Sequence, residues 1–252
     1  MSVKQPRRIF IGDVHGHYDG LMHLLDAIAP GTSDRVYFLG DLIDRGPQSS
    51  SVVNFVQNSS YQCIRGNHEQ LLIDAFPDGK LHSPALQAWL YSGGQSTVSS
   101  YQDMRELIDH VHWAQSLPTY LDLGDVWLVH AGVHPGLPID EQTPEELCWV
   151  RDLFHSMEQP YFSDKLIITG HTITFTLPGI EPGKIAKGRG WIDIDTGAYH
   201  RKSGWLTALD LTCELVYQVN VFEGGCRVMS LADATMEVDP RKVSDRHQLL
   251  SR

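Results

Sequence analysis

Residues 8–16 read RIFIGDVHG, a short apolar run that ends abruptly in glycine, aspartate and histidine. The same organisation returns twice, because residues 35–41 read RVYFLGD and residues 61–67 read YQCIRGN. An apolar run closed by Gly-Asp or Gly-Asn is typical of a buried strand that ends in a turn. Helical spacing of apolar residues follows each run, at Leu21, Leu24, Leu25 and Ile28 and around residues 48–56 and 69–75. Three successive strand–loop–helix units predict an α/β fold with a parallel or mixed sheet covered by helices.

The middle of the chain changes character. Residues 80–117 have a helical pattern that Gly93-Gly94 interrupts, and Gly124-Asp125 between two apolar runs predicts a hairpin. Further strands are expected at residues 166–169, 192–195, 206–211 and 214–219. We therefore interpret residues 1–252 as a single domain with its core at about residues 9–222.

Two segments carry weaker patterns. Residues 178–190 are rich in glycine, proline and lysine, which predicts a surface loop. Residues 230–252 have weak periodicity and several charges, which predicts a peripheral C-terminal tail.

Composition limits the possible classes of protein. The 252 residues carry a formal net charge of −11 and are 42% hydrophobic, which is ordinary for a globular protein. So acidic a chain does not suit a protein that coats nucleic acid, since that task needs an extended basic face. No apolar run approaches the roughly 18 residues that span a bilayer. Four scattered cysteines and an apolar N-terminal stretch too short for a secretory signal favour the cytoplasm, with no membrane or nucleic-acid partner.

Metal-ligating side chains follow five of the expected strands. They are Asp13, His15, Asp41, Asn67, His130 and His171. Ligands of open α/β sheets gather outside the carboxyl ends of strands, so these groups are expected to meet. Carboxylate, amide and imidazole groups without thiolates suit Mn²⁺, Fe or Zn²⁺, and the hardness of the donors favours Mn²⁺.

The motif series resembles the phosphoprotein phosphatase branch of the calcineurin-like metallophosphoesterases, and especially the bacterial and bacteriophage lambda-type protein phosphatases. The resemblance rests on residues 12–16 (GDVHG), 40–46 (GDLIDRG), 66–69 (GNHE), 130–132 (HAG) and 170–171 (GH), in that order. It implies an α/β/β/α sandwich, in which two mixed β-sheets are flanked by helices. It also implies two divalent metal ions.

The resemblance implies a role for each motif residue. Asp13 and His15 would hold one metal, Asn67, His130 and His171 the other, and Asp41 would bridge them. His68 would be the general acid, oriented by Asp44, and Arg45 and Arg151 would bind the phosphate oxygens.

Three activities remain open from the sequence. The first is a protein-serine/threonine phosphatase with a phosphoprotein substrate, with phosphotyrosine and phosphohistidine as further candidates. The second is a hydrolase of dinucleoside polyphosphates such as diadenosine tetraphosphate, which shares the motif series. The third is a metal-dependent binding protein without catalysis. The first is favoured because the second class tends to carry a neutral residue in place of Asp44. The oligomeric state does not follow from the sequence.

Overall fold

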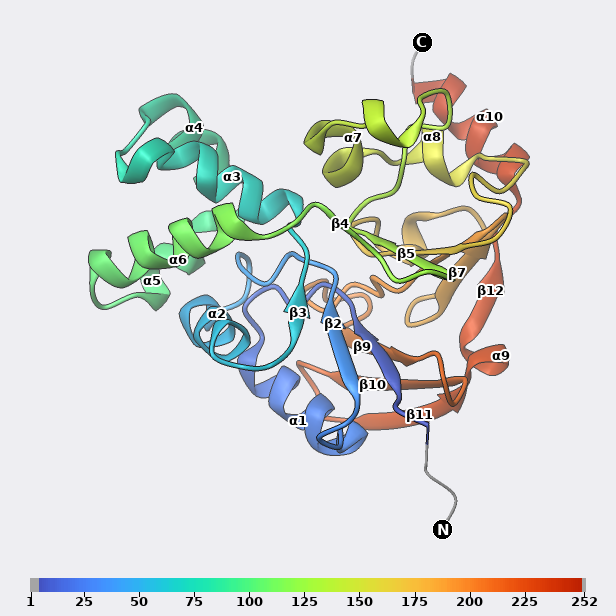
Figure 1. The fold of residues 1–252 in the computed structure, drawn as a ribbon, viewed down its shortest axis with the longest axis horizontal. Helices are drawn as coiled ribbons and strands as arrows, with labels where there is room; N and C mark the ends of the chain where they lie inside the picture. Colours follow the sequence, from blue (N-terminus) through green and yellow to red (C-terminus); the bar gives the residue numbers. More distant parts are fainter. Residues whose placement is uncertain (1–4, 251–252) are drawn as a thin grey trace.

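The computed structural model describes residues 5–250, with side chains through residue 245. Within that span two six-stranded sheets stack face to face, and helices cover their outer faces (Figure 1). We call them sheet A, with strand order β11-β10-β9-β1-β2-β3, and sheet B, with strand order β12-β7-β8-β6-β5-β4. The strands of sheet A are β1 (Arg8–Ile11), β2 (Arg35–Phe38), β3 (Gln62–Cys63), β9 (Trp205–Asp210), β10 (Leu215–Asn220) and β11 (Cys226–Ser230). Those of sheet B are β4 (Tyr120–Asp122), β5 (Val126–Val129), β6 (Leu166–Thr169), β7 (Ile185–Gly188), β8 (Trp191–Asp193) and β12 (Thr235–Glu237).

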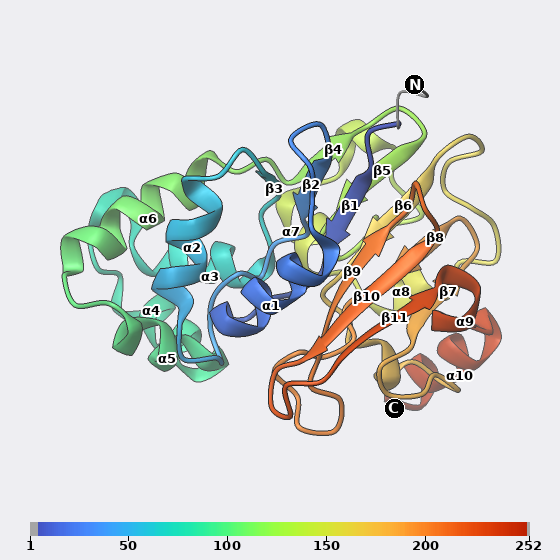
Figure 2. The same cartoon turned by 90° about the horizontal axis from the view of Figure 1, so that it is seen from below.

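The helices fall into three groups. Below sheet A lie α1 (Tyr18–Ile28) and α2 (Ser49–Gln57), and the helical lobe beside them contains α3 (Asn67–Ala75), α4 (Ser83–Trp89), α5 (Gln95–Ser100) and α6 (Met104–Ser116). Figure 2 shows this lobe projecting to one side of the sheets. Over sheet B lie α7 (Pro144–Trp149), α8 (Asp152–His155) and α10 (Pro240–Leu250), and the short α9 (Leu231–Ala234) follows β11. None of the described helices has the length and apolarity needed to cross a bilayer.

Both sheets are mixed. In sheet A, β1 pairs in parallel with β2 and antiparallel with β9, and β2 pairs in parallel with β3. In sheet B, β6 pairs in parallel with both β5 and β8, while β4 and β5 form the expected antiparallel hairpin. The predicted α/β fold with two mixed sheets is therefore confirmed.

Alternation of side chains along the strands explains why the sheets stack. Phe10 of β1 faces the other sheet, whereas its neighbours Ile9 and Ile11 face the helices below sheet A. On β5, Leu128 enters the core between the sheets and Trp127 packs under the helices over sheet B. Because successive side chains of a strand point to opposite faces, a strand that is apolar throughout is stable only when both faces are covered.

Two predictions about weakly patterned segments need correction. Residues 178–190 are not a surface loop throughout, because they include β7, whose Ile185 and Ala186 are fully buried. The C-terminal segment is not peripheral throughout either: β12 pairs in parallel with β7, and Val243 of α10 is fully buried against sheet B. In both segments the strands are only three or four residues long, too short to produce a clear periodicity.

The buried position of Val243 can be tested directly. We expect Val243→Ala to lower the free energy of unfolding by roughly 1–3 kcal/mol, because it removes two buried methyl groups and leaves a cavity. Lys242→Ala, at an exposed position of the same helix, is the matched control and should change stability little. Urea denaturation of the three proteins measures the difference. Equal stability of the two variants would show that α10 does not belong to the core.

Candidate active site

The predicted ligands meet at one edge of the sandwich. Asp13 and His15 follow β1, Asp41 follows β2, and Asn67 follows β3, all from sheet A; His130 and His171 follow β5 and β6 of sheet B. All six are buried, with at most 5% of any residue exposed. Parallel strands bring their carboxyl ends to the same edge, so the site lies where the two sheets meet.

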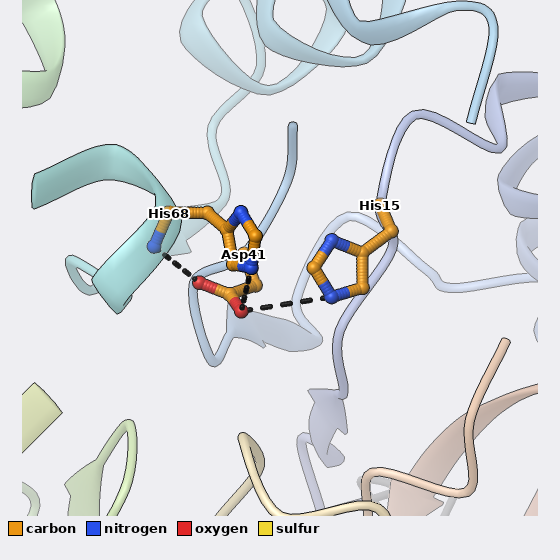
Figure 3. A group of neighbouring side chains, drawn as sticks. All are labelled: His15, Asp41 and His68. Carbon is orange, nitrogen blue, oxygen red and sulfur yellow. Dashed lines mark hydrogen bonds and ion pairs between the residues drawn. The ribbon is translucent and has the colours of Figure 1, made fainter. Parts of the chain in front are cut away.

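Asp41 is shared by two groups of potential metal ligands. Figure 3 shows the first group, formed by Asp41, His15 and His68; the second contains Asp41, His130 and His171. Within each group the ligand atoms lie within 4.8 Å of one another. The Nε2 atom of His15 lies 3.6 Å from Asp41 Oδ2, and that of His130 lies 3.4 Å from Asp41 Oδ1. Each oxygen of Asp41 thus faces a different group, an arrangement that is compatible with a bridging ligand.

Backbone carbonyls fix the orientation of two histidines. The Nδ1–H of His15 donates to the carbonyl of Ile43 at 2.8 Å, and that of His130 donates to the carbonyl of Leu39 at 2.7 Å. In each ring Nε2 is left to face Asp41. A hydrogen bond from the second ring nitrogen is the usual support of a metal-binding histidine.

In the second group, one amide oxygen and two imidazole nitrogens lie close enough together to bind a single cation. The Oδ1 atom of Asn67 lies 3.0 Å from His130 Nε2 and 2.8 Å from His171 Nδ1. The Nε2 atom of His171 is buried without a hydrogen-bond partner among the described residues. Two imidazole nitrogens that face one amide oxygen, beside the Asp41 carboxylate, fit a divalent metal ion of the Mn²⁺, Fe or Zn²⁺ type.

The two groups of potential metal ligands differ from the prediction in their members: they include His68 and leave out Asp13. The carboxylate of Asp13 accepts the backbone N–H of His171, at 3.2 Å and 3.1 Å from its two oxygens, and stands outside the two tight groups. His68, predicted as the acid, lies inside the first group instead. Burial, together with the charges of Asp195 and Asp41, raises the pKa of Asp13 well above its ordinary value. Such a carboxyl group is costly to ionise unless positive charge compensates it.

The backbone of the site is strained. Five of the eight non-glycine residues with positive φ among residues 5–250 lie here: His15, Asp41, Asp44, Arg45 and His171. Side chains other than glycine rarely adopt this conformation, so the surrounding structure must hold it in place.

Glu69 provides much of that support. Its carboxylate accepts the backbone N–H groups of Asp41 and Leu42, both at 2.8 Å, and that of Gly66 at 2.9 Å. Gly66 must be glycine, because a Cβ there would lie 2.3 Å from Asp41 Oδ1. Glu69 is 1% exposed. The sequence analysis did not assign it to the site, although Gly-Asn-His-Glu at a helix start is the pattern in which the third helical residue bonds back to the chain.

His68 and Asp44 form the predicted pair. The Nδ1 atom of His68 lies 2.6 Å from Asp44 Oδ2. Asp44 also accepts the indole N–H of Trp89 at 3.0 Å and the hydroxyl of Thr97 at 2.6 Å, and all three residues are fully buried. Burial alone would lower the pKa of His68, but the carboxylates of Asp41 and Asp44 outweigh it and raise that pKa above its ordinary value. The pair therefore orients the imidazole and favours its protonated form.

Arg45 is held over the site by the aromatic ring of Tyr199, which is not among the predicted site residues. Its guanidinium carbon lies 4.0 Å from the centre of the Tyr199 ring, and Nη2 lies 3.2 Å from His68 Nε2. The edge of His15 meets the same tyrosine, with ring centres 4.7 Å apart. Cation–π contact fixes the direction of the arginine without neutralising it.

Arg151, the second predicted arginine, is anchored through its backbone. The Nδ1–H of His155 donates to the Arg151 carbonyl at 2.9 Å, and His155 Nε2 lies 3.3 Å from Asp193 Oδ2. Burial lowers the pKa of His155 to about 4, and burial together with the charge of Asp195 raises the pKa of Asp193 well above its ordinary value. The Arg151 side chain stays exposed at the cavity, with Nη1 3.4 Å from the His171 carbonyl.

These groups line one polar cavity of about 310 Å³. Both arginines, His68 and Asp41 contribute to its wall, as does Asp195, which the sequence analysis did not select. Burial, opposed by the hydrogen bond from the Gly197 N–H, raises the pKa of Asp195 to about 6. All ten predicted site residues therefore lie in or directly around this cavity, an arrangement suited to binding and cleaving a phosphate group.

The support given by Glu69 leads to a prediction. In Glu69→Gln an amide NH₂ replaces one of the two oxygens that accept backbone N–H groups. We expect the free energy of unfolding to fall by roughly 1–3 kcal/mol, since a buried donor loses its partner. Bound metal should fall as well, because Asp41 is no longer held in its strained conformation. Glu158→Gln, at an exposed position, is the control, and metal analysis with urea denaturation gives both readouts. Unchanged stability and metal content would contradict the role of Glu69.

The chain is similar in sequence to a known protein family. The model of the family described as calcineurin-like phosphoesterase matches residues 6–221. The chain belongs to this family. Membership establishes a metallophosphoesterase, and the His/Asp groups of the site agree with metal binding.

Two curated relatives that match the chain carry the same name. A symmetrical bis(5'-nucleosyl)-tetraphosphatase of Buchnera aphidicola is 31% identical over 132 residues, covering 50% of this chain and 44% of the relative. The protein of the same name from Coxiella burnetii (strain RSA 331) is 35% identical over 144 residues, covering 56% and 47%. The chain thus matches about half the length of these relatives.

Solved structures agree on the fold. A protein described as a candidate diadenosine tetraphosphatase superimposes with a TM-score of 0.61 at 19% identity, covering 91% of this chain and 96% of that one. A protein serine/threonine phosphatase from Saccharomyces cerevisiae gives 0.57 at 15% identity, covering 87% and 74%. At such identities the likeness shows the fold alone, which both substrate classes share.

The predicted protein-serine/threonine phosphatase activity is therefore wrong. The named relatives are dinucleoside tetraphosphatases, which favours the alternative that the sequence analysis had placed second. That ranking rested on Asp44. In the structure Asp44 orients His68 and bonds to Trp89 and Thr97, and this support does not depend on the group attached to the phosphate.

Proposed function

We propose that the protein is a metal-dependent hydrolase of dinucleoside tetraphosphates that cleaves its substrate symmetrically into two nucleoside diphosphates. The observation that carries the proposal is the similarity to symmetrical bis(5'-nucleosyl)-tetraphosphatases. The cavity supports it chemically, because Arg45 and Arg151 offer positive charge for more than one phosphate group. A phosphoprotein substrate is not part of this proposal.

The strand-end ligands fit two divalent ions. In this proposal Asp13 and His15 would hold one ion, Asn67, His130 and His171 would hold the other, and Asp41 would contribute to both sites. Such ions, when bound, act as Lewis acids on phosphate oxygens and make water acidic enough to serve as a nucleophile.

The remaining steps belong to side chains of this chain. Arg45, held on Tyr199, and Arg151, held through His155, bind the phosphate oxygens with forked hydrogen bonds. They fix the central P–O–P linkage against the ligand cluster, so that water attacks one phosphorus in line with the departing oxygen.

His68 completes the reaction as the proton donor. Hydrolysis places the hydroxyl of water on one phosphorus, and the departing nucleoside diphosphate takes up a proton. His68, whose Nδ1 is bonded to Asp44, presents Nε2 towards Arg45 and Asp41. A histidine with a raised pKa in this position can protonate the leaving oxygen. A binding protein without catalysis would not need this acid, so we set that alternative aside.

The proposal predicts both a substrate preference and a product pattern. After metal removal and reloading with Mn²⁺, diadenosine tetraphosphate should be hydrolysed faster than a phosphoserine peptide, and without added metal turnover should be lost. Anion-exchange chromatography should find ADP as the nucleotide product. Formation of AMP with ATP would contradict symmetrical cleavage, and preference for the peptide would contradict the substrate class.

A further inference from the structure

One of the six tryptophans is exposed at the catalytic cavity. Trp149, the last residue of α7, is 39% exposed, whereas Trp89, Trp127 and Trp191 are at most 4% exposed. It lines the catalytic cavity two residues before Arg151. Its ring centre lies 6.3 Å from that of His171, with the two planes at 81°. An exposed indole on the wall of the catalytic cavity offers a π face on which a planar ligand group can stack.

The other aromatic ring of the cavity is already engaged. The guanidinium of Arg45 lies over the ring of Tyr199, and His15 meets that ring edge to face. Its task is therefore to orient Arg45. Among the described residues that line the cavity, Trp149 is the large aromatic side chain that is exposed, at 39%.

We propose that Trp149 is the nucleobase subsite of the enzyme and that one base of the substrate stacks on its indole. The inference rests on the proposed function, which supplies a substrate with a base beyond the phosphates. Indole stacking accepts any base because every base has a π face, so the subsite should bind purines with little discrimination. The neighbouring Arg151 would bind the phosphate of the same nucleotide. The base and the phosphate of one nucleotide would then contact two residues that lie close together in the chain.

The test compares two ligands that differ only in the base. AMP and ribose 5-phosphate compete with p-nitrophenyl phosphate in the Mn²⁺-loaded enzyme, and the ratio of their inhibition constants isolates the contribution of the base. In Trp149→Ala we expect the AMP constant to rise about 5-fold to 100-fold. The ribose 5-phosphate constant should change far less. Trp149→Phe should restore part of the preference, and GMP should behave like AMP.

Phe222→Ala is the matched control, because Phe222 has a similar exposed fraction, 41%, and does not line the cavity. It should retain the preference for AMP. An equal loss for both ligands in Trp149→Ala would mean that the residue only supports the site, and would overturn the proposal. A native enzyme with no preference for AMP over ribose 5-phosphate would overturn it as well.

The assay separates this proposal from the proposed function. Its readout is the turnover of p-nitrophenyl phosphate, so it works whether or not diadenosine tetraphosphate is cleaved. A base preference that depends on Trp149, found in an enzyme that does not cleave diadenosine tetraphosphate, would support the subsite and reject the tetraphosphatase. Cleavage of diadenosine tetraphosphate with no role for Trp149 would do the reverse.

Discussion

The hydrogen bond from His130 Nδ1–H to the carbonyl of Leu39 joins the two sheets at the point where the chemistry is placed. Leu39 follows β2 of sheet A and His130 follows β5 of sheet B, so this contact sets how the two strand ends face each other. It also leaves His130 Nε2 pointing at Asp41. Residues such as Phe10 and Leu128 form the apolar core between the sheets. Their packing sets the distance between the sheets at which this hydrogen bond can form. A site assembled from two sheets therefore depends on their packing as well as on its own ligands.

Burying so many polar groups where the two sheets meet costs free energy. Contacts among the same groups offset part of that cost. Asp41 lies beside His68 and His130; burial would raise its pKa, but these partners lower it well below its ordinary value. Glu69 holds the strained backbone of Asp41 through three backbone N–H groups. The Asp13 carboxyl group is buried and its pKa is raised well above its ordinary value, and divalent cations at the site would supply the positive charge that stabilises its ionised form. The strain and the buried charge are thus concentrated where binding energy from the metals is available.

Much of this site could be predicted from the sequence, because its ligands follow short apolar strands directly. Asp13, Asp41 and Asn67 each follow a glycine at a strand end. This local pattern can be recognised in the sequence without knowledge of the fold. β7 was missed because it is four residues long and owes its existence to pairing with β8 and β12. The support that Glu69 gives is equally non-local, since it bonds to backbone groups 27 and 28 residues away. Substrate class could not be obtained from Asp44, because its bonds to His68, Trp89 and Thr97 orient the imidazole and do not contact the group attached to the phosphate.

The central claim is that one carboxylate, Asp41, is shared by two metal ions. Electron paramagnetic resonance of the protein, stripped of metal and then titrated with Mn²⁺, tests it most directly. At full loading we expect the broad, exchange-coupled spectrum of two Mn²⁺ ions joined by a bridging ligand, with the uncoupled six-line signal of isolated Mn²⁺ suppressed. A spectrum that keeps the isolated six-line signal at full loading would contradict the shared ligand and the two-metal site built on it.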